Sequence, residues 1–397
     1  MLLAAVIACL GSFSVATAAD YTVNSADEFV TAWNQAAASN EASTITITVP
    51  SGSDNITLTQ EQRAQLNAIS GTGNVTVQMA DASNQLINFN YDLVNNQVSF
   101  NDITLKELPG SDNDIVVANA STTTTIDGRN IAIKGANDAA NPRTVGATVT
   151  STNGQVGIGD NVSMEKAVTV TGQATQTVDP ATGQAYTRTT YNTYNNSNEQ
   201  AVVLGNNVTM QDTVTATGQI VSDPASKVTL NGDVTSTAGI GTVTTEQFDA
   251  SNTQTGKTVI DSMDDSVSGG IILGETTAGA VTLKTEGGNI SLGDNSVLDG
   301  TTVSAESADL NKTVYSNDGG SWNTVASTEK LGTIEGSVTL GENTTVKGNS
   351  TLTADDNIAI GNNSVITGNT AADGVISAGG QISIGDGTQV LGNTATS

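Results

Sequence analysis

Few side chains in this sequence could carry out acid–base chemistry. The chain of 397 residues has no histidine, which excludes His-dependent triads and His-ligated metal sites. It has four arginines, and only Arg129 follows an acidic residue, Asp127, within an alternating segment. The two side chains could face outward together. The segment Thr125–Ile133 is more simply explained by turn geometry, so we predict no catalytic residue.

Acidic residues recur at two kinds of position. Three aspartates hold equivalent corners of the repeat described below: Asp160, Asp294 and Asp386. Because they are several repeats apart, they cannot converge on one substrate, and we interpret their role as structural. The run Asp261, Asp264 and Asp265 either binds calcium or is a solvated loop. A tandem calcium-binding nonapeptide would need much shorter spacing. We predict no cofactor and no metal site, and calcium binding stays open.

The main signal for the surrounding structure is a repeat. It consists of two apolar residues around a variable one, then glycine, then an acidic or amide residue, then asparagine or glycine. Six segments follow it: Val156–Asn161, Val202–Asn207, Ile290–Asn295, Val338–Asn343, Ile358–Asn363 and Ile382–Gly387. They begin 46, 88, 48, 20 and 24 residues apart. These gaps are near 2, 4, 2, 1 and 1 units of about 20–24 residues, the size of one β-helix coil with three strands and three turns.

Each unit has a simple physical interpretation. The two apolar residues point to the inner face of a strand. We expect the corner that follows to need a positive φ, which glycine, asparagine and aspartate tolerate. The corner glycines are Gly159, Gly205, Gly293, Gly341, Gly361 and Gly385. A second strand ends in apolar-x-Gly-Asn, at Asn349, Asn369 and Asn393. These asparagines either form a hydrogen-bonded ladder between coils or are simply good turn formers.

Three insertions interrupt the repeat, near residues 172–200, 247–269 and 311–330. The first and third are predicted to be protruding hairpins, whereas the second is polar and acidic. Insertions in solenoids commonly lie on one face, and that face is often the binding one. We therefore predict binding by the aromatic residues of the first and third insertions: Tyr186, Tyr191, Tyr194, Tyr315 and Trp322.

The N-terminus predicts an export signal over residues 1–18. Residues 2–10 are apolar, and Ala16-Thr17-Ala18 is a small-residue cleavage pattern. The single cysteine, Cys9, lies within this segment, so disulfides cannot stabilise the mature chain. No later stretch approaches the ~20 apolar residues of a membrane-spanning helix.

Residues 19–43 are predicted to cap the first coil. A capping box at Ser25–Glu28 begins the one helix that we expect, and Phe29, Ala32, Trp33 and Ala36 follow at helical spacing. The helix would cover the open end of the strand stack. The first strand is expected over 44–49, and the β-helix over 44–397. The predicted fold class is therefore all-β, a right-handed parallel β-helix with a capping helix and hairpin insertions.

Composition narrows the range of partners. The formal net charge is -27, from 40 acidic and 13 basic residues, which argues against nucleic acid because phosphate binding needs clustered lysine and arginine. Aromatic residues are only 3% of the chain, and glycine is frequent at 41 residues. This composition favours narrow strands and tight turns over a broad core.

Two resemblances follow from the motifs. The step at residues 125–133 is similar to a strand–turn–strand step of the pectin-lyase-like β-helix superfamily. The C-terminal third resembles repeats of polymorphic outer-membrane proteins and autotransporter passengers, with Gly-Gly-x-apolar at Gly287–Ile290 and Gly379–Ile382. An aliphatic residue replaces the family's Phe in its Phe-x-x-Asn step, at Ile366–Asn369 and Val390–Asn393. The resemblance implies surface display by a C-terminal membrane barrel, which this chain lacks, so we expect its C-terminal end to be incomplete.

Taken together, these features predict an exported, non-catalytic adhesin or autotransporter passenger. Its expected location is the cell surface, the outer membrane or the medium of a Gram-negative bacterium, and its expected partners are host-cell glycans or proteins. A first alternative is a β-helix polysaccharide lyase or glycoside hydrolase, which requires converging carboxylates or carboxylates beside arginine. A second alternative is a passive surface-layer or stalk component, which requires neither a groove nor aromatic projections.

Overall fold

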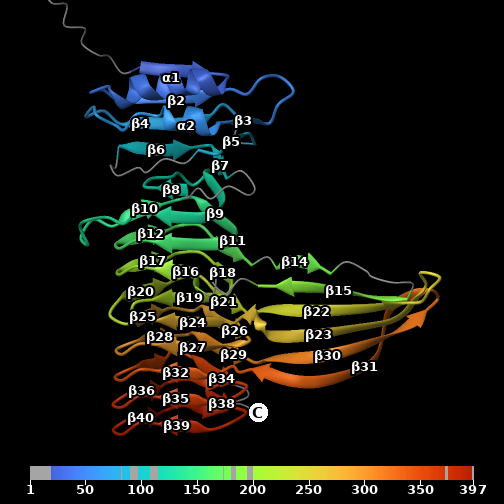
Figure 1. Ribbon diagram of the computed structural model, residues 1–397. Coiled ribbons are helices and arrows are strands. Elements are labelled where there is room, and N and C mark those ends of the chain that lie inside the picture. The colour runs from blue at the N-terminus through green and yellow to red at the C-terminus, as the bar shows by residue number, and fades with distance from the viewer. Residues whose placement is uncertain are drawn as a thin grey trace, which may run out of the picture.

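The computed structural model describes residues 19–81, 83–89, 97–107, 115–172, 174–179, 185–194, 200–371 and 374–395. Short parallel strands stack in successive coils below helix α1 (Ala26–Ala37), as Figure 1 shows. The prediction of an all-β parallel β-helix with a capping helix and hairpin insertions is confirmed. The predicted signal peptide, with Cys9, lies outside the described residues.

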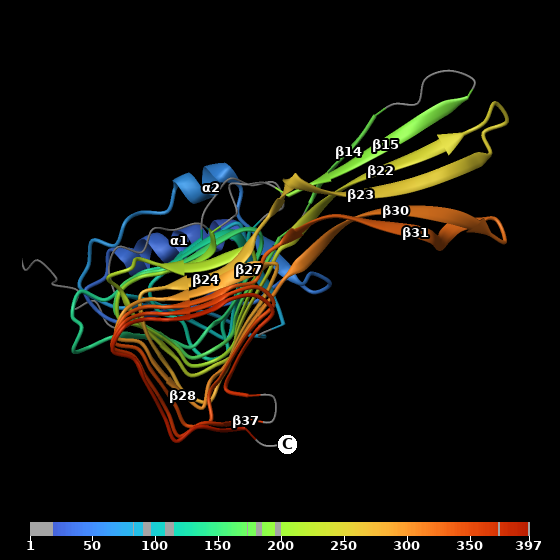
Figure 2. The same cartoon turned by 90° about the horizontal axis from the view of Figure 1, so that it is seen from below.

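Three walls of parallel strands enclose one narrow core, seen end-on in Figure 2. Side chains alternate between inside and outside along each strand. In Val162–Met164 and Ile358–Ile360, for example, the two end residues are buried and the middle one is partly exposed. Aliphatic side chains of successive coils, as far as Ile366, pack into one continuous core, whereas Ile382 and Ile384 in the last coil are exposed. The apolar-x-apolar pattern therefore forms strands because each coil covers the apolar residues of the next.

The strands are distributed as follows. The first wall contains β3 (Asn55–Thr57), β5 (Gln85–Ile87), β7 (Thr104–Lys106), β9 (Thr125–Ile133), β11 (Thr148–Ile158), β13 (Val168–Thr171), β18 (Val214–Thr217), β21 (Val234–Thr237), β26 (Thr282–Glu286), β29 (Thr302–Glu306), β34 (Thr351–Ala354) and β38 (Ile376–Ala378). The second wall contains β8 (Ile115–Val117), the ends of β9 and β11, β16 (Gln200–Leu204), β19 (Gln219–Ser222), β24 (Gly269–Leu273), β27 (Gly288–Leu292), β32 (Val338–Leu340), β35 (Ile358–Ile360) and β39 (Ile382–Ile384). The third wall contains β10 (Arg143–Val145), β12 (Val162–Met164), β17 (Val208–Met210), β20 (Lys227–Leu230), β25 (Glu275–Ala278), β28 (Val297–Asp299), β33 (Thr345–Lys347), β36 (Val365–Thr367) and β40 (Gln389–Leu391). A sheet near the N-terminus contains β1 (Ala19–Val23), β2 (Ser43–Ile47), β4 (Val75–Met79) and β6 (Val98–Asn101), and β37 (Thr370–Ala371) pairs with β41 (Thr394–Ala395).

Helix α1 covers the N-terminal end of the core, as predicted. Phe29 and Trp33 are fully buried, and their rings lie 5.8 and 5.6 Å from the ring of Phe89, centroid to centroid. These edge-on contacts close the first coils with aromatic rather than aliphatic side chains. Ser25 Oγ accepts a hydrogen bond from the backbone N–H of Glu28 at 3.3 Å.

Three details of the cap differ from the prediction. The Glu28 carboxylate accepts from the N–H of Asn24, not from that of the N-cap residue, so the capping box is incomplete. Strand β1 precedes α1 and pairs with β2, so β2 is not the first strand. A second helix, α2 (Gln60–Ala64), follows β3, with no buried residue to give it a periodic apolar pattern. Neither helix is long and apolar enough to cross a membrane, within the described part of the chain.

The repeat gaps overestimate the number of coils. Val156 pairs directly with Val202, and Ile290 pairs directly with Val338, so each of these gaps holds one coil and not two. Val202 and Ile290 are separated by three steps and not four, through β19 and β24. The additional residues leave the wall as hairpins and return to it. An insertion about as long as a coil cannot be told from a coil by gap length alone.

The corner glycines are required for a different reason from the one predicted. The residue with positive φ is the asparagine that follows, at φ 56–62° in five corners: Asn161, Asn207, Asn295, Asn343 and Asn363. Only the last corner uses glycine for this purpose, Gly387 at φ 73°. A Cβ on each corner glycine would lie 2.5–2.7 Å from an atom of the preceding coil, at Gly159, Gly205, Gly293, Gly341, Gly361 and Gly385. These glycines therefore allow adjacent coils to approach closely.

All three corner asparagines form hydrogen bonds between coils, and one of them also has the backbone conformation of a turn former. The buried side chain of Asn369 donates to the Val346 carbonyl at 3.1 Å and to Asn393 Oδ1 at 2.9 Å, and accepts from the N–H of Ser350 at 2.9 Å. Asn369 and Asn393 thus form a ladder between coils. Asn349, one residue before this ladder, combines both roles, since its φ is 70° and its Oδ1 accepts from the N–H of Thr370 in the next coil at 3.1 Å.

Substituting Gly341 with alanine should destabilise the shaft, because the new Cβ would lie 2.5 Å from the backbone nitrogen of Asp294. We expect a loss of about 1–3 kcal/mol, the usual cost of overpacking. Gly279 is the matched control, since its added Cβ would meet nothing within 4 Å and its φ is not positive. Thermal unfolding followed by circular dichroism should rank Gly341→Ala below Gly279→Ala. Equal midpoints would show that the coils do not require glycine at this corner.

Candidate binding surface

The three insertions form hairpins that join into one antiparallel sheet, which we call the projecting sheet. The hairpins are β14 (Thr175–Val178) with β15 (Tyr186–Thr193), β22 (Gly239–Phe248) with β23 (Gln254–Val267), and β30 (Ala308–Asp318) with β31 (Ser321–Ile334). The sheet order is β14-β15-β22-β23-β30-β31. Figures 1 and 2 show that it extends away from one corner of the shaft.

The hairpins join because of where they leave the shaft. Each is inserted between a strand of the first wall and a strand of the second wall, after β13, β21 and β29. The intervening coils pass from β18 to β19 and from β26 to β27 without insertion. Two coils advance by about 2 × 4.8 Å, and the two strands of a hairpin occupy the same width. Hairpins on alternate coils therefore meet at normal strand spacing.

The insertion bounds were only partly predicted. The second hairpin begins at Gly239 and ends at Val267, and the third begins at Ala308 and ends at Ile334. Their first and last residues continue the alternating pattern of the walls, so the sequence shows no break there. The stretch predicted only as polar and acidic is the second hairpin of the sheet.

The projecting sheet is a single layer with solvent on both faces. Its buried aliphatic side chains lie only at the base: Val267, Leu310 and Ile334. Beyond the base, every described side chain is partly or fully exposed. A sheet with no second layer to cover it presents two faces to other molecules.

One face, the Tyr186 face, carries interlocked aromatic and charged side chains. The rings of Tyr186 and Phe248 stack at 4.7 Å between centroids and 18° between planes. Arg188 lies over Phe248 at 5.3 Å and binds Glu246 through Nε at 2.8 Å. On the next strands, the ammonium of Lys257 lies 4.8 Å from the centroid of the Tyr315 ring. Two of the five predicted binding residues, Tyr186 and Tyr315, are thus on this face.

The other predicted aromatic residues lie elsewhere. Tyr191 is on the opposite face, where its hydroxyl donates to Asp179 at 3.4 Å. Tyr194 packs at the base, since a Cβ on Gly239 would lie 2.5 Å from its ring, and its N–H donates to the Asp265 carbonyl at 2.8 Å. Trp322 is partly buried near the tip of the third hairpin. The structure therefore does not bring the five residues together.

Two further pairs of charged side chains join strands of the sheet. Lys330 lies 2.5 Å from Asp309, and its hydrogen bond lowers the pKa of the Asp309 carboxyl. Lys312 lies 3.8 Å from Glu329. These exposed pairs mainly fix strand register and contribute little to stability.

The acidic run Asp261, Asp264 and Asp265 lies on β23, and the Asp261 side chain joins two strands. The Asp261 carboxylate accepts from the N–H of Asn311 at 2.8 Å and so joins β23 to β30. Asp265 lies at the base beside Thr193, and Asp264 is exposed. Within the described residues, no group of three or more acidic, histidine or cysteine side chains could hold a metal ion.

Asp127 and Arg129, the pair considered above as a possible catalytic site, both bind neighbouring residues of the shaft. Asp127 forms an ion pair with Lys106 at 3.2 Å, and the backbone N–H of Arg129 donates to Glu107 at 2.5 Å. Both belong to β9, one continuous strand that crosses from the first wall to the second, where a turn was expected.

The three corner aspartates act between coils. Asp160 and Asp294 accept from backbone N–H groups of the following coil at 2.8 and 2.7 Å. The N–H of Asp386 donates to Asn362 Oδ1 at 2.8 Å. Each interaction satisfies a backbone group at a corner, so these residues hold coils in register.

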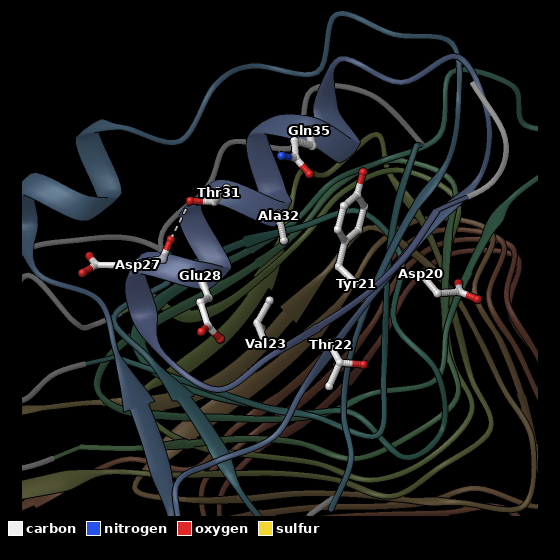
Figure 3. A pocket seen from close by; sticks show the side chains of 9 residues that line it. All are labelled: Asp20, Tyr21, Thr22, Val23, Asp27, Glu28, Thr31, Ala32 and Gln35. Atoms are coloured by element: carbon white, nitrogen blue, oxygen red, sulfur yellow. Dashed lines mark hydrogen bonds between the residues drawn. The ribbon is translucent and has the colours of Figure 1, made fainter. Parts of the chain in front are cut away.

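A groove of about 480 Å³ lies between β1 and α1, and Figure 3 shows its lining. Asp20 and Asp27 lie at opposite ends of the view, so their carboxylates do not converge. Asp27 accepts from Gln62 at 2.6 Å, and Glu28 is bound to the N–H of Asn24. The groove therefore lacks the paired carboxylates of a glycoside-cleaving site.

A second groove of about 370 Å³ lies where the second and third hairpins leave the shaft. Gly269, Gly270 and Gly288 form part of its lining, and the exposed side chains of Met263 and Ile272 stand beside them. It contains a single acidic side chain, Glu335, and so also lacks a carboxylate pair.

Comparison with known protein families, with curated proteins and with solved structures finds no match.

Replacing Asp261 with alanine should loosen the junction between the second and third hairpins. β23 and β30 pair over only four residues each, so loss of the bond to Asn311 removes a large share of their contact. We expect a local cost of about 2 kcal/mol and faster proteolysis of the turn at Gly319. Asp264→Ala is the control, because Asp264 is exposed beside the same strand. If both variants are cleaved at the wild-type rate, Asp261 does not hold the hairpins together.

Proposed function

We propose that this chain is an exported, surface-displayed or secreted binding protein of a Gram-negative bacterium. In this proposal the shaft holds the projecting sheet away from the cell, and the sheet contacts host-cell glycans or proteins. The export signal, the autotransporter-like repeats and the surface location are parts of the same proposal. They rest on the sequence patterns at residues 1–18 and in the C-terminal third.

The observation that carries the proposal is the separation of aromatic residues from the shaft. The aromatic residues after Phe100 lie in the three hairpins, on a sheet with both faces in solvent, except for Tyr194, which follows β15 and packs at the base. The buried apolar side chains of the shaft beyond its cap are aliphatic rather than aromatic. Aromatic side chains are enriched in binding sites because they bury much apolar surface with little loss of rotamer entropy.

Two features favour binding over the alternatives. A polysaccharide-cleaving enzyme needs two carboxylates held in one cleft, and the grooves described above do not provide them. A passive stalk has no use for a single-layer sheet, because such a sheet has neither a covered face nor a core of its own to stabilise it. Because the sheet gains little stability from burial, we infer that its exposed faces serve to bind a partner.

Removing the three hairpins should abolish binding and leave the shaft folded. Residues 174–198, 240–266 and 309–333 are each replaced by a short Gly-Ser linker, since the paired ends Gly239 and Val267, and Ala308 and Ile334, lie side by side. We expect at least a tenfold loss of binding to cultured epithelial cells.

The matched control removes only the third hairpin. Circular dichroism of all variants should retain the β-sheet spectrum of the shaft. Binding that persists at the wild-type level without any hairpin would contradict the proposal and would assign binding to the shaft.

A further inference from the structure

We infer that the Tyr186 face binds a carbohydrate that carries carboxylate groups, laid across the strands of the projecting sheet. This inference rests on the proposed function, because it assigns a ligand class to the same sheet. It starts from one row of directly opposed residues: Arg188 on β15, Glu246 on β22, Lys257 on β23 and Tyr315 on β30. Directly opposed residues point to the same side of a sheet, so the row is continuous.

The row has a flat aromatic surface near each end. Phe248 lies two residues beyond Glu246 and is stacked on Tyr186, whose hydroxyl is bonded to Asn252 at 2.5 Å. Tyr315 lies two strands away, which places the surfaces about 10 Å apart across the sheet. Each aromatic surface also carries a cation, since Arg188 lies over Phe248 and Lys257 lies over Tyr315. A short oligosaccharide could therefore contact both surfaces at once.

The basic side chains of the projecting sheet indicate which charge the ligand carries. Arg188, Lys312 and Lys330 each have a carboxylate within 4 Å, at Glu246, Glu329 and Asp309 respectively. Lys257 differs from them, since within the described residues its ammonium forms no ion pair and rests only on the Tyr315 ring. Among the described lysines and arginines of the projecting sheet, Lys257 is thus the one without a carboxylate partner. A ligand carboxylate would complete a charge-assisted hydrogen bond with it.

The row next to it supplies groups that recognise hydroxyls. Thr190 is opposed to Thr244, and Thr313 is opposed to Val259. Threonine hydroxyls donate and accept, as sugar hydroxyls do.

The overall charge of -27 disfavours densely charged polymers, but shaft charges farther than about 8 Å from the ligand are screened at physiological ionic strength. The site therefore suits isolated carboxylates, as in uronic or sialic acids, rather than polyphosphates.

The opposite face provides a matched control. There Tyr191, Val243 and Ile260 are directly opposed, and the cation of the row, Lys312, is paired with Glu329. This face has an aromatic residue and a lysine on the same strands or their neighbours, but its lysine has a carboxylate partner. Substitutions on the two faces thus alter similar side chains in the same sheet.

The test is binding of the full chain to an array of oligosaccharides that contain uronic or sialic acid, each matched with its methyl ester or desialylated form. We expect binding to the acidic members only. Lys257→Gln and Phe248→Ala should each weaken it about tenfold or more. Lys312→Gln and Tyr191→Ala should bind as the wild type does. Phe248→Tyr, which keeps the stacked ring, should restore binding and so exclude misfolding as the cause.

Several results would overturn the inference. Equal binding to acidic and neutral members, wild-type binding by Lys257→Gln, or no binding to any member would each contradict it. Binding to cells that is lost without the hairpins but unchanged in Lys257→Gln and Phe248→Ala would retain the proposed function and reject this ligand. Cell binding that is abolished by protease treatment but unchanged after enzymatic removal of sialic and uronic acids would identify a protein partner and also reject it.

Discussion

Backbone hydrogen bonds between successive coils hold each coil one strand spacing, about 4.8 Å, from the next. The other features of the shaft meet this requirement. Corner glycines allow backbones to pass closely, asparagines take the positive φ that each turn needs, and the Asn369–Asn393 ladder satisfies polar groups inside a corner. The same spacing determines what the hairpins can do. Inserted on alternate coils at one corner, they are forced to lie at the distance at which strands pair.

The parallel β-helix could be predicted because inward and outward positions alternate and the corners repeat. The number of coils could not, since a hairpin occupies about as many residues as a coil and extends the gap without altering the motif. The close contact between coils that requires the corner glycines could not be predicted either. A sequence shows which residues are small, but the atom that a Cβ would meet at Gly205 belongs to Asp160, in the preceding coil. Helix α2 was missed because it buries nothing and has no periodic pattern.

The binding surface could be predicted only in outline. Composition indicated the first and third hairpins, because aromatic residues are rare and gather there. Phe248 and Lys257 were missed, although both lay within a stretch identified as an insertion. Their importance depends on neighbours from other hairpins: Phe248 stacks on Tyr186, and Lys257 lies over Tyr315. Because such neighbours are about 60 residues apart in sequence, no local pattern connects them. Tyr194 shows the converse, an aromatic residue whose position at the base is structural.

The proposed binding surface exists only if three hairpins from separate coils form one sheet. Thr258 of the second hairpin and Val314 of the third are directly opposed, so cysteines at these positions would lie within reach of a disulfide. With Cys9 replaced, we expect the Thr258→Cys, Val314→Cys double variant to form an intramolecular disulfide under mild oxidation, detected by mass spectrometry of proteolytic fragments. Free thiols, or disulfides only between molecules, would show that the hairpins move independently and that the shared surface does not exist.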